Sequence, residues 1–165
     1  MIQSSYRRRE HLRLPFFDYS QYGCYFVTIC TKNRQCVFGE IIDGVMQLNV
    51  FGEILKEILL SLTKYYPNSI LTDFVIMPNH LHFIWFNQDN VPLSEIVKKF
   101  KGNVTKQYHS FMISQNKAYE PLWQRSFYEH IIRDDKDYER IATYIENNPL
   151  QWEYLIKSLR LNWLN

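Results

Sequence analysis

Two histidines that flank a single leucine, His80-Leu81-His82, are the first candidates for chemistry in this chain of 165 residues. They open a run of apolar and aromatic residues that extends to Phe86 and predicts a β-strand. Side chains at positions i and i+2 of a strand point to the same face, so the two imidazoles lie one pleat apart. Neutral imidazole is a common ligand of divalent metals. The spacing fits a metal site, but by itself it favours a pair of hydrogen-bonded histidines in a buried strand.

Tyr144 and Asn148 form a second candidate pair, because residues four apart share one face of a predicted helix. A phenol can act as a nucleophile through a covalent intermediate. The amide oxygen of Asn148 can complete the ligand shell of a metal. The alternative is structural: Tyr144 packs in the core, and Asn148 ends the helix before Pro149.

The elements that must position these residues alternate between strand and helix patterns. Asp43-Gly44 is a two-residue hairpin signal, and Pro78-Asn79 separates two strands because proline lacks the amide donor. A polar stretch at 112–121 is expected to be a disordered loop. This order predicts an α+β fold, a ferredoxin-like βαββαβ antiparallel sheet with helices on one side, an extra hairpin and a C-terminal catalytic helix. Strands are expected at 24–31, 40–42, 45–48, 70–77, 80–86 and 127–132, and helices at 49–65, 94–108 and from Asp134 or Asp135 to about Asn148.

Length and composition favour a single folded domain over residues 1–165, with residues 1–20 as a basic arm. The aromatic content of 16% predicts an ample core. No stretch approaches the roughly 18 apolar residues of a membrane span, and the N-terminus does not resemble a secretory leader. Cys24, Cys30 and Cys36 fit no zinc pattern, so they are expected to be buried, reduced thiols of a cytoplasmic protein.

The formal net charge of only +2 conceals two basic segments. Concentrated lysines and arginines bind phosphates electrostatically, although each segment also fits a solvated surface. A further arginine follows Trp123-Gln124, where a packing role for the tryptophan and a phosphate contact for the arginine are both reasonable. The predicted DNA-binding residues are Arg7, Arg8, Arg9, Lys98, Lys99, Lys101, Lys106 and Arg125.

Four motifs, in this order and spacing, carry a family resemblance: Met77 to Trp85, Trp123 to Arg125, His130 to Asp134, and Tyr144 to Pro149. Together they resemble the single-tyrosine HUH transposases of the IS200/IS605 type, and specifically the REP-associated tyrosine transposase branch. The resemblance extends from about Tyr22 to Asn148.

The resemblance implies a role for each matching residue. His80 and His82 match the motif that holds a divalent cation, Mg²⁺ or Mn²⁺, and Tyr144 matches the nucleophile. Asn148 matches the helix position that approaches the metal, where the IS200/IS605 branch usually has glutamine. His130 matches a general family position and is expected to be structural.

The function implied is cleavage and rejoining of single-stranded DNA near hairpins, through a 5′-phosphotyrosine intermediate. The implied partner is hairpin-bearing single-stranded DNA, such as REP-like sequences or element ends. The protein would be a monomer or homodimer in the cytoplasm, associated with the nucleoid. The chain has no phosphate-binding glycine loop, which agrees with a reaction that needs no nucleotide cofactor.

Two other functions fit the same residues. A non-catalytic module could bind single-stranded nucleic acid on a ferredoxin-like sheet, although no RNP1 motif is recognisable. A metal-dependent hydrolase could use water in place of Tyr144 as the nucleophile.

Overall fold

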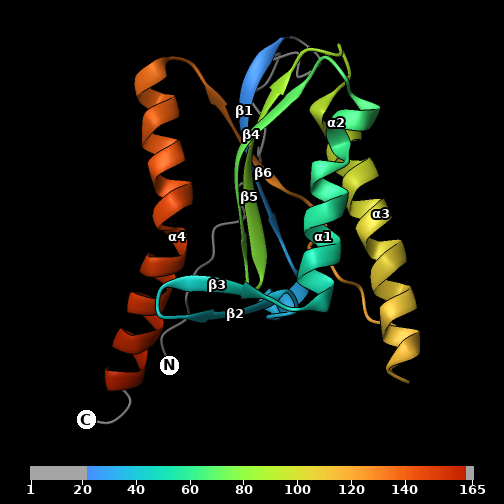
Figure 1. Ribbon diagram of the computed structural model, residues 1–165, viewed down its shortest axis with the longest axis vertical. Coiled ribbons are helices and arrows are strands. Elements are labelled where there is room, and N and C mark those ends of the chain that lie inside the picture. The colour runs from blue at the N-terminus through green and yellow to red at the C-terminus, as the bar shows by residue number, and fades with distance from the viewer. Residues whose placement is uncertain (1–21, 163–165) are drawn as a thin grey trace, which may run out of the picture.

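A four-stranded antiparallel sheet lies at the centre of the computed structural model, which describes residues 22–162 and the side chains as far as Ile156 (Figure 1). The strands lie side by side in the order β4-β5-β1-β6, and each neighbouring pair is antiparallel. This order confirms the predicted α+β, ferredoxin-like arrangement. The four strands are β1 (Gly23–Cys30), β4 (Ile70–Met77), β5 (His80–Asn87) and β6 (Tyr128–Ile132).

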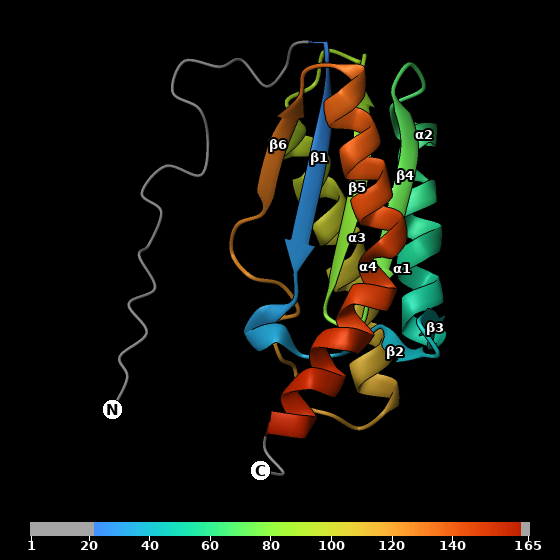
Figure 2. The same ribbon diagram turned by 90° about the vertical axis from the view of Figure 1, so that its left-hand side faces the viewer.

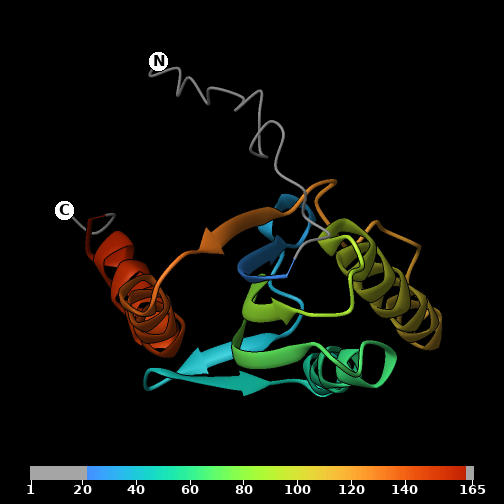
Figure 3. The same ribbon diagram turned by 90° about the horizontal axis from the view of Figure 1, so that it is seen from above.

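Helices cover both faces of this sheet. The helices α1 (Val50–Leu60), α2 (Leu62–Tyr65) and α3 (Leu93–Ser114) lie on one face, as expected. The last helix, α4 (Asp135–Asn162), lies alone on the other face, as the view from above shows (Figure 3). The expectation of helices on one side therefore holds for the first three, and the helix with the candidate tyrosine is the exception.

Alternation along the central strand β5 divides the core into two layers. Leu81, Phe83 and Trp85 point toward α1 and α3 and belong to the larger apolar cluster. Ile84 points the other way, toward Ile141 and Ile145 of α4. β5 is a central strand of the sheet, and helices cover both of its faces, so its sequence is almost continuously apolar. His80 and His82 share the face of Ile84, which is the face toward α4.

The hairpin forms as the sequence predicts. Its strands are β2 (Gly39–Ile42) and β3 (Val45–Leu48), and the turn residues Asp43 and Gly44 have φ of 50° and 74°. Positive φ at both positions is the requirement of a type I′ turn. Asn49 then caps α1, because its side-chain oxygen accepts the backbone N–H of Gly52 at 2.8 Å.

Two helices run further than the sequence predicts. Helix α3 continues to Ser114, since Met112 extends the buried spacing of Val104 and Tyr108, so the start of the expected loop at 112–121 is helical. Helix α4 begins where expected, with the Asp134 carboxylate accepting the Asp137 N–H at 2.9 Å. Among the described helices, none is long and apolar enough to cross a membrane.

The predicted end of α4 near Asn148 is wrong, because the helix passes through Pro149 and continues to Asn162 (Figure 2). Proline removes one hydrogen bond from the helix, at a cost of about 3 kcal/mol. Contacts beyond the proline offset that cost. The Trp152 ring lies 5.7 Å from the ring of His80, and Leu150 lies against the hairpin turn at Gly44.

The three cysteines are free thiols, but the expectation that all are buried is wrong. Cys24 and Cys30 are half-buried on β1, whereas Cys36 is exposed in the loop after β1. Burial, together with the nearby carboxylates of Asp73 and Asp137, raises the pKa of Cys24 to about 12. A thiol with so high a pKa is protonated at neutral pH and is a poor nucleophile.

Candidate active site

His80 and His82 lie next to each other on the face of β5 that α4 covers, as the strand spacing predicts. Their ring centroids are 4.7 Å apart, and only 7% and 4% of the two residues are exposed. Buried imidazoles need hydrogen-bond partners, and each ring has one at its Nδ1 atom.

Asn79 fixes the ring of His80. The Oδ1 atom of Asn79 lies 2.7 Å from Nδ1 of His80, and its Nδ2 donates to the backbone carbonyl of Arg34 at 3.1 Å. The second bond assigns the amide orientation, so Oδ1 is the atom that accepts from the imidazole N–H. The proton of His80 is therefore on Nδ1, and the lone pair is on Nε2.

Thr28 holds the ring of His82. It lies opposite His82 in the β1–β5 register, and its hydroxyl is 2.7 Å from Nδ1 of that ring. Partners of this kind orient metal-ligating histidines in proteins and are nearly as important to affinity as the ligands.

The surroundings keep both imidazoles neutral. Burial lowers the pKa of His80 to about 4, the charge of Arg34 adds to this effect, and a hydrogen bond with Asn148 opposes it. Burial, and then the neighbouring His80, lowers the pKa of His82 to about 3. Metal ions bind neutral imidazole, so this pair is in the correct protonation state at pH 7.

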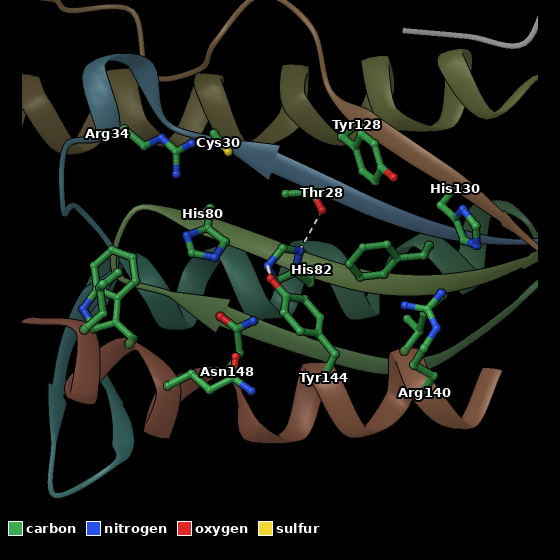
Figure 4. A pocket seen from close by; sticks show the side chains of 15 residues that line it. Thr28, Cys30, Arg34, His80, His82, Tyr128, His130, Arg140, Tyr144 and Asn148 are labelled. Atoms are coloured by element: carbon green, nitrogen blue, oxygen red, sulfur yellow. Dashed lines mark hydrogen bonds between the residues drawn. The ribbon is translucent and has the colours of Figure 1, made fainter. Parts of the chain in front are cut away.

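Tyr144 and Asn148 come to the histidines from α4 (Figure 4). The Tyr144 hydroxyl lies 3.4 Å from Nε2 of His82, and its ring meets Phe26 edge-on. Tyr144 is 40% exposed, so it lies at the edge of the site and not in the core, whereas Asn148 is buried. The fold thus brings all four residues of the two candidate pairs together.

These four residues line a pocket of about 780 Å³ between the sheet and α4. Among the described residues that line it, Arg34 and Arg140 carry a permanent charge and none is acidic. The pocket on the other side of α4 has the opposite character, with Asp73, Glu139 and Glu146 in its lining. The lining residues of the first pocket are Phe26, Thr28, Cys30, Arg34, His80, His82, Tyr128, His130, Arg140, Ile141, Tyr144, Asn148, Gln151, Trp152 and Leu155.

The donor set of the pocket fits a divalent cation, although no group of three His, Cys, Asp or Glu that could hold a metal occurs within residues 22–162. His80 and His82 offer two oriented nitrogens, and the amide of Asn148 lies beside them. A metal here would take its remaining ligands from water or from a bound phosphate, as divalent cations at phosphate-processing sites do.

The predicted DNA-binding residues that the structure describes lie elsewhere. Lys98, Lys99, Lys101 and Lys106 are on α3, across the sheet from the pocket. The Lys99 ammonium lies over the ring of Tyr65, and Lys101 donates to the carbonyl of Gln124 at 2.7 Å. Arg125 is exposed before β6, and Arg7, Arg8 and Arg9 lie outside the described residues. The structure brings none of the described members of this set to the pocket.

One residue of the second motif, Trp123, and one of the third, His130, have clear contacts. Trp123 packs against Phe38 and Phe100, and its N–H donates to the Lys101 carbonyl, so it has the packing role considered for it. His130, expected to be structural, lines the pocket and hydrogen-bonds Asp137 at 2.7 Å.

Sequence reasoning missed Asn79, Thr28, Arg34 and Arg140. Asn79 directly precedes the first histidine, and that adjacency was a usable signal. Arg140 is four residues before Tyr144, a spacing that places both on one helix face. Thr28 and Arg34 are about fifty residues away from the histidines. The β1–β5 register brings Thr28 to the site, and the turn after β1 brings Arg34.

Comparison with known proteins identifies the family. The family model described as "Transposase IS200 like" matches residues 20–148. An uncharacterized protein of Haemophilus influenzae is 38% identical over an alignment of 167 positions, which spans 88% of this chain and 90% of the relative. A REP-associated tyrosine transposase of Escherichia coli is 26% identical, with coverage of 81% and 70%.

A solved structure of a REP-associated tyrosine transposase bound to a REP hairpin has the same fold. Its TM-score is 0.63 at 21% identity, and the match covers 84% of this chain and 74% of that one. With the family model spanning most of the chain, we conclude that the chain belongs to the IS200-like transposase family, among the relatives of the REP-associated tyrosine transposases.

Proposed function

We propose that this protein is a DNA endonuclease and strand transferase that cleaves and rejoins single-stranded DNA through Tyr144. One observation carries the proposal: the Tyr144 hydroxyl lies 3.4 Å from Nε2 of His82, at the edge of a pocket that also holds His80 and Asn148. A nucleophile beside two oriented, neutral imidazoles is an arrangement suited to phosphoryl transfer.

Tyr144 attacks the scissile phosphorus. Its oxygen forms a bond to phosphorus while the bond from phosphorus to the 3′-oxygen breaks. The proton that the phenol loses passes through water to the 3′-oxygen, which leaves as a free hydroxyl. The product is a 5′-phosphotyrosine. A second 3′-hydroxyl then attacks the phosphotyrosine, releases the phenol and joins two DNA ends. One phosphodiester replaces another, so the reaction consumes no nucleotide cofactor.

His80, His82 and Asn148 would hold the divalent cation, Mg²⁺ or Mn²⁺, which when bound withdraws charge from a phosphate oxygen as a Lewis acid. The protein's own contribution is orientation. Asn79 and Thr28 fix the two rings through their Nδ1 atoms, and burial keeps both rings unprotonated. Little reorganisation is then needed when the cation and the phosphate bind.

Single-stranded DNA is the substrate that the pocket fits best. Its cationic lining suits a phosphodiester, whereas the acidic pocket across α4 would repel one. Tyr128, which is 41% exposed, and Trp152 add aromatic surface on which unpaired bases can stack. The solved relative bound to a REP hairpin supports a hairpin-bearing strand as the substrate.

The test is cleavage of a labelled hairpin-bearing oligonucleotide with Mn²⁺ present or removed by chelation. The proposal predicts metal-dependent cleavage that His80→Gln abolishes and that His109→Gln, on the exposed face of α3, leaves intact. Binding without cleavage of any hairpin tested would favour the non-catalytic module. Cleavage that persists in Tyr144→Phe but not in His80→Gln would make water the nucleophile.

A further inference from the structure

Two arginines lie on either side of the histidine pair. Arg34 is at the His80 end of the pocket, and Arg140 is at the opposite end, beside His130 (Figure 4). The cleavage chemistry described above uses neither residue, yet both side chains are part of the pocket lining.

The backbone at Arg34 has a strained conformation, and neighbouring residues hold it there. Arg34 and the preceding Asn33 have φ of 57° and 54°, the left-handed region that costs a side-chain-bearing residue about 1 kcal/mol or more. Surrounding bonds hold the turn: Asn79 donates to the Arg34 carbonyl at 3.1 Å, and the Thr31 N–H donates to the Asn79 carbonyl at 2.9 Å. Strain that the surroundings maintain is typical of functional positions.

Asp137 positions Arg140 at the other end. One carboxylate oxygen of Asp137 accepts from Arg140, and the other lies 2.7 Å from Nε2 of His130. The Asp137 side chain is only 17% exposed, so the aspartate is an anchor, whereas Arg140 is 67% exposed. A guanidinium has five N–H donors, so one anchored in this manner still has donors for a phosphate.

The sheet register gives the spacing at the Arg140 end of the pocket. Cys30, Thr28 and Phe26 of β1 pair with His80, His82 and Ile84 of β5. Phe26 also pairs with His130 of β6, so His130 lies one two-residue step beyond the level of His82. Such a step is about 7 Å, a spacing comparable to that of successive phosphates in an extended single strand.

We propose that Arg34 and Arg140 bind the phosphates on either side of the scissile phosphate, so that the pocket holds three successive phosphates of one DNA strand. This inference rests on the proposed function, because it places the scissile phosphate beside His80, His82 and Tyr144. His130 and Asp137 are positioning residues for Arg140.

The experiment measures binding of a short single-stranded oligonucleotide over a range of salt concentrations, in a Tyr144→Phe background that cannot form a covalent bond. Each phosphate contact that is lost reduces the slope of log affinity against log salt by about 0.7. Arg34→Gln and Arg140→Gln should each reduce the slope by about that amount and weaken binding about ten- to a hundredfold at low salt. Arg133→Gln is the matched control, since Arg133 is exposed beside β6 and outside this pocket.

Lysine variants distinguish the loss of a phosphate contact from misfolding of the protein. Arg34→Lys and Arg140→Lys keep the charge and should keep the salt slope, while circular dichroism reports whether each variant folds. Oligonucleotides with one neutral methylphosphonate assign the contacts. A neutral linkage on one side of the cleavage point should weaken binding to the Tyr144→Phe parent but not to the same protein with Arg34→Gln. The linkage on the other side should weaken binding to the parent but not to the protein with Arg140→Gln.

Salt slopes that match those of Arg133→Gln would overturn the inference, as would a parent protein that does not bind the oligonucleotide. The proposed function has a separate readout, covalent adduct formation in the protein that retains Tyr144. If an adduct forms but the salt slopes are unchanged, the proposed nuclease activity is supported and the phosphate contacts are refuted. If the slopes are reduced but no adduct forms, the phosphate contacts are supported and the proposed nuclease activity is refuted.

Discussion

The hydroxyl of Tyr144 lies 3.4 Å from Nε2 of His82, although 62 residues separate the two in the sequence. The contact exists because α4 packs on the sheet face that carries the histidines. Ile141 and Ile145 of α4 pack against Phe26 and Ile84 of the sheet. The small apolar cluster around these residues therefore fixes how the candidate nucleophile faces the candidate metal ligands.

We expect Ile145→Ala to lower the free energy of unfolding by about 2–5 kcal/mol, since Ile145 is 4% exposed and its loss leaves a cavity under α4. Tyr154→Ala is the control on the same helix. Tyr154 is 66% exposed, so its truncation should cost about 0.5 kcal/mol or less. Urea denaturation monitored by circular dichroism measures both. Equal costs would show that α4 does not dock through Ile145.

Asn79→Ala should weaken Mn²⁺ binding about 10–100-fold, because it frees the ring of His80 to rotate and to change tautomer. Calorimetric titration of the protein with MnCl₂ gives the affinity. Asn68→Ala is the matched control, as Asn68 hydrogen-bonds Asp89 and is not part of the pocket. An Asn79→Ala affinity equal to that of the control would contradict the role assigned to Asn79.

The lowered pKa of Asp137 predicts that the stability of the protein depends on pH. Its hydrogen bond with His130, and then its contacts with Arg140, hold the pKa of this carboxyl below the ordinary value against the opposing effect of burial. A carboxyl with a lowered pKa in the folded state stabilises the protein above the unfolded pKa of about 3.9, and the contribution is lost as pH falls through the folded value. Wild type should therefore exceed Asp137→Asn in unfolding free energy by about 1 kcal/mol at pH 5, and the difference should shrink toward pH 2. Urea denaturation across this range tests the trend, and a difference that grows with acid would refute it.

Local signals in the sequence were sufficient for most of the fold. Asp43-Gly44 dictates the hairpin because few residue pairs tolerate positive φ at two positions, and Asn49 caps α1 through its own side chain. Pro149 misled the prediction because its cost is local, while the contacts that offset it come from His80 and the hairpin turn, which are distant in sequence.

The distinction between local sequence signals and contacts between distant residues also applies to the site. His80, His82, Tyr144 and Asn148 occur at strand and helix spacings that can be read from short segments. Thr28 and Arg34 enter the pocket only through the pairing of β1 with β5 and through the turn that follows β1, and neither has a sequence pattern of its own. The lysines of α3 look suited to DNA in sequence, but two of them have partners within the protein.

The measurement that tests the central claim most directly is identification of the residue that becomes covalently bound to DNA. The protein is incubated with Mn²⁺ and a hairpin-bearing oligonucleotide, digested, and analysed by mass spectrometry for a nucleotide-linked peptide. Tyr128→Phe is the matched control, because Tyr128 lines the same pocket and is equally exposed. We predict a 5′-phosphotyrosine on Tyr144, present in Tyr128→Phe and absent in Tyr144→Phe. An adduct on another residue, or one that persists in Tyr144→Phe, would contradict the account.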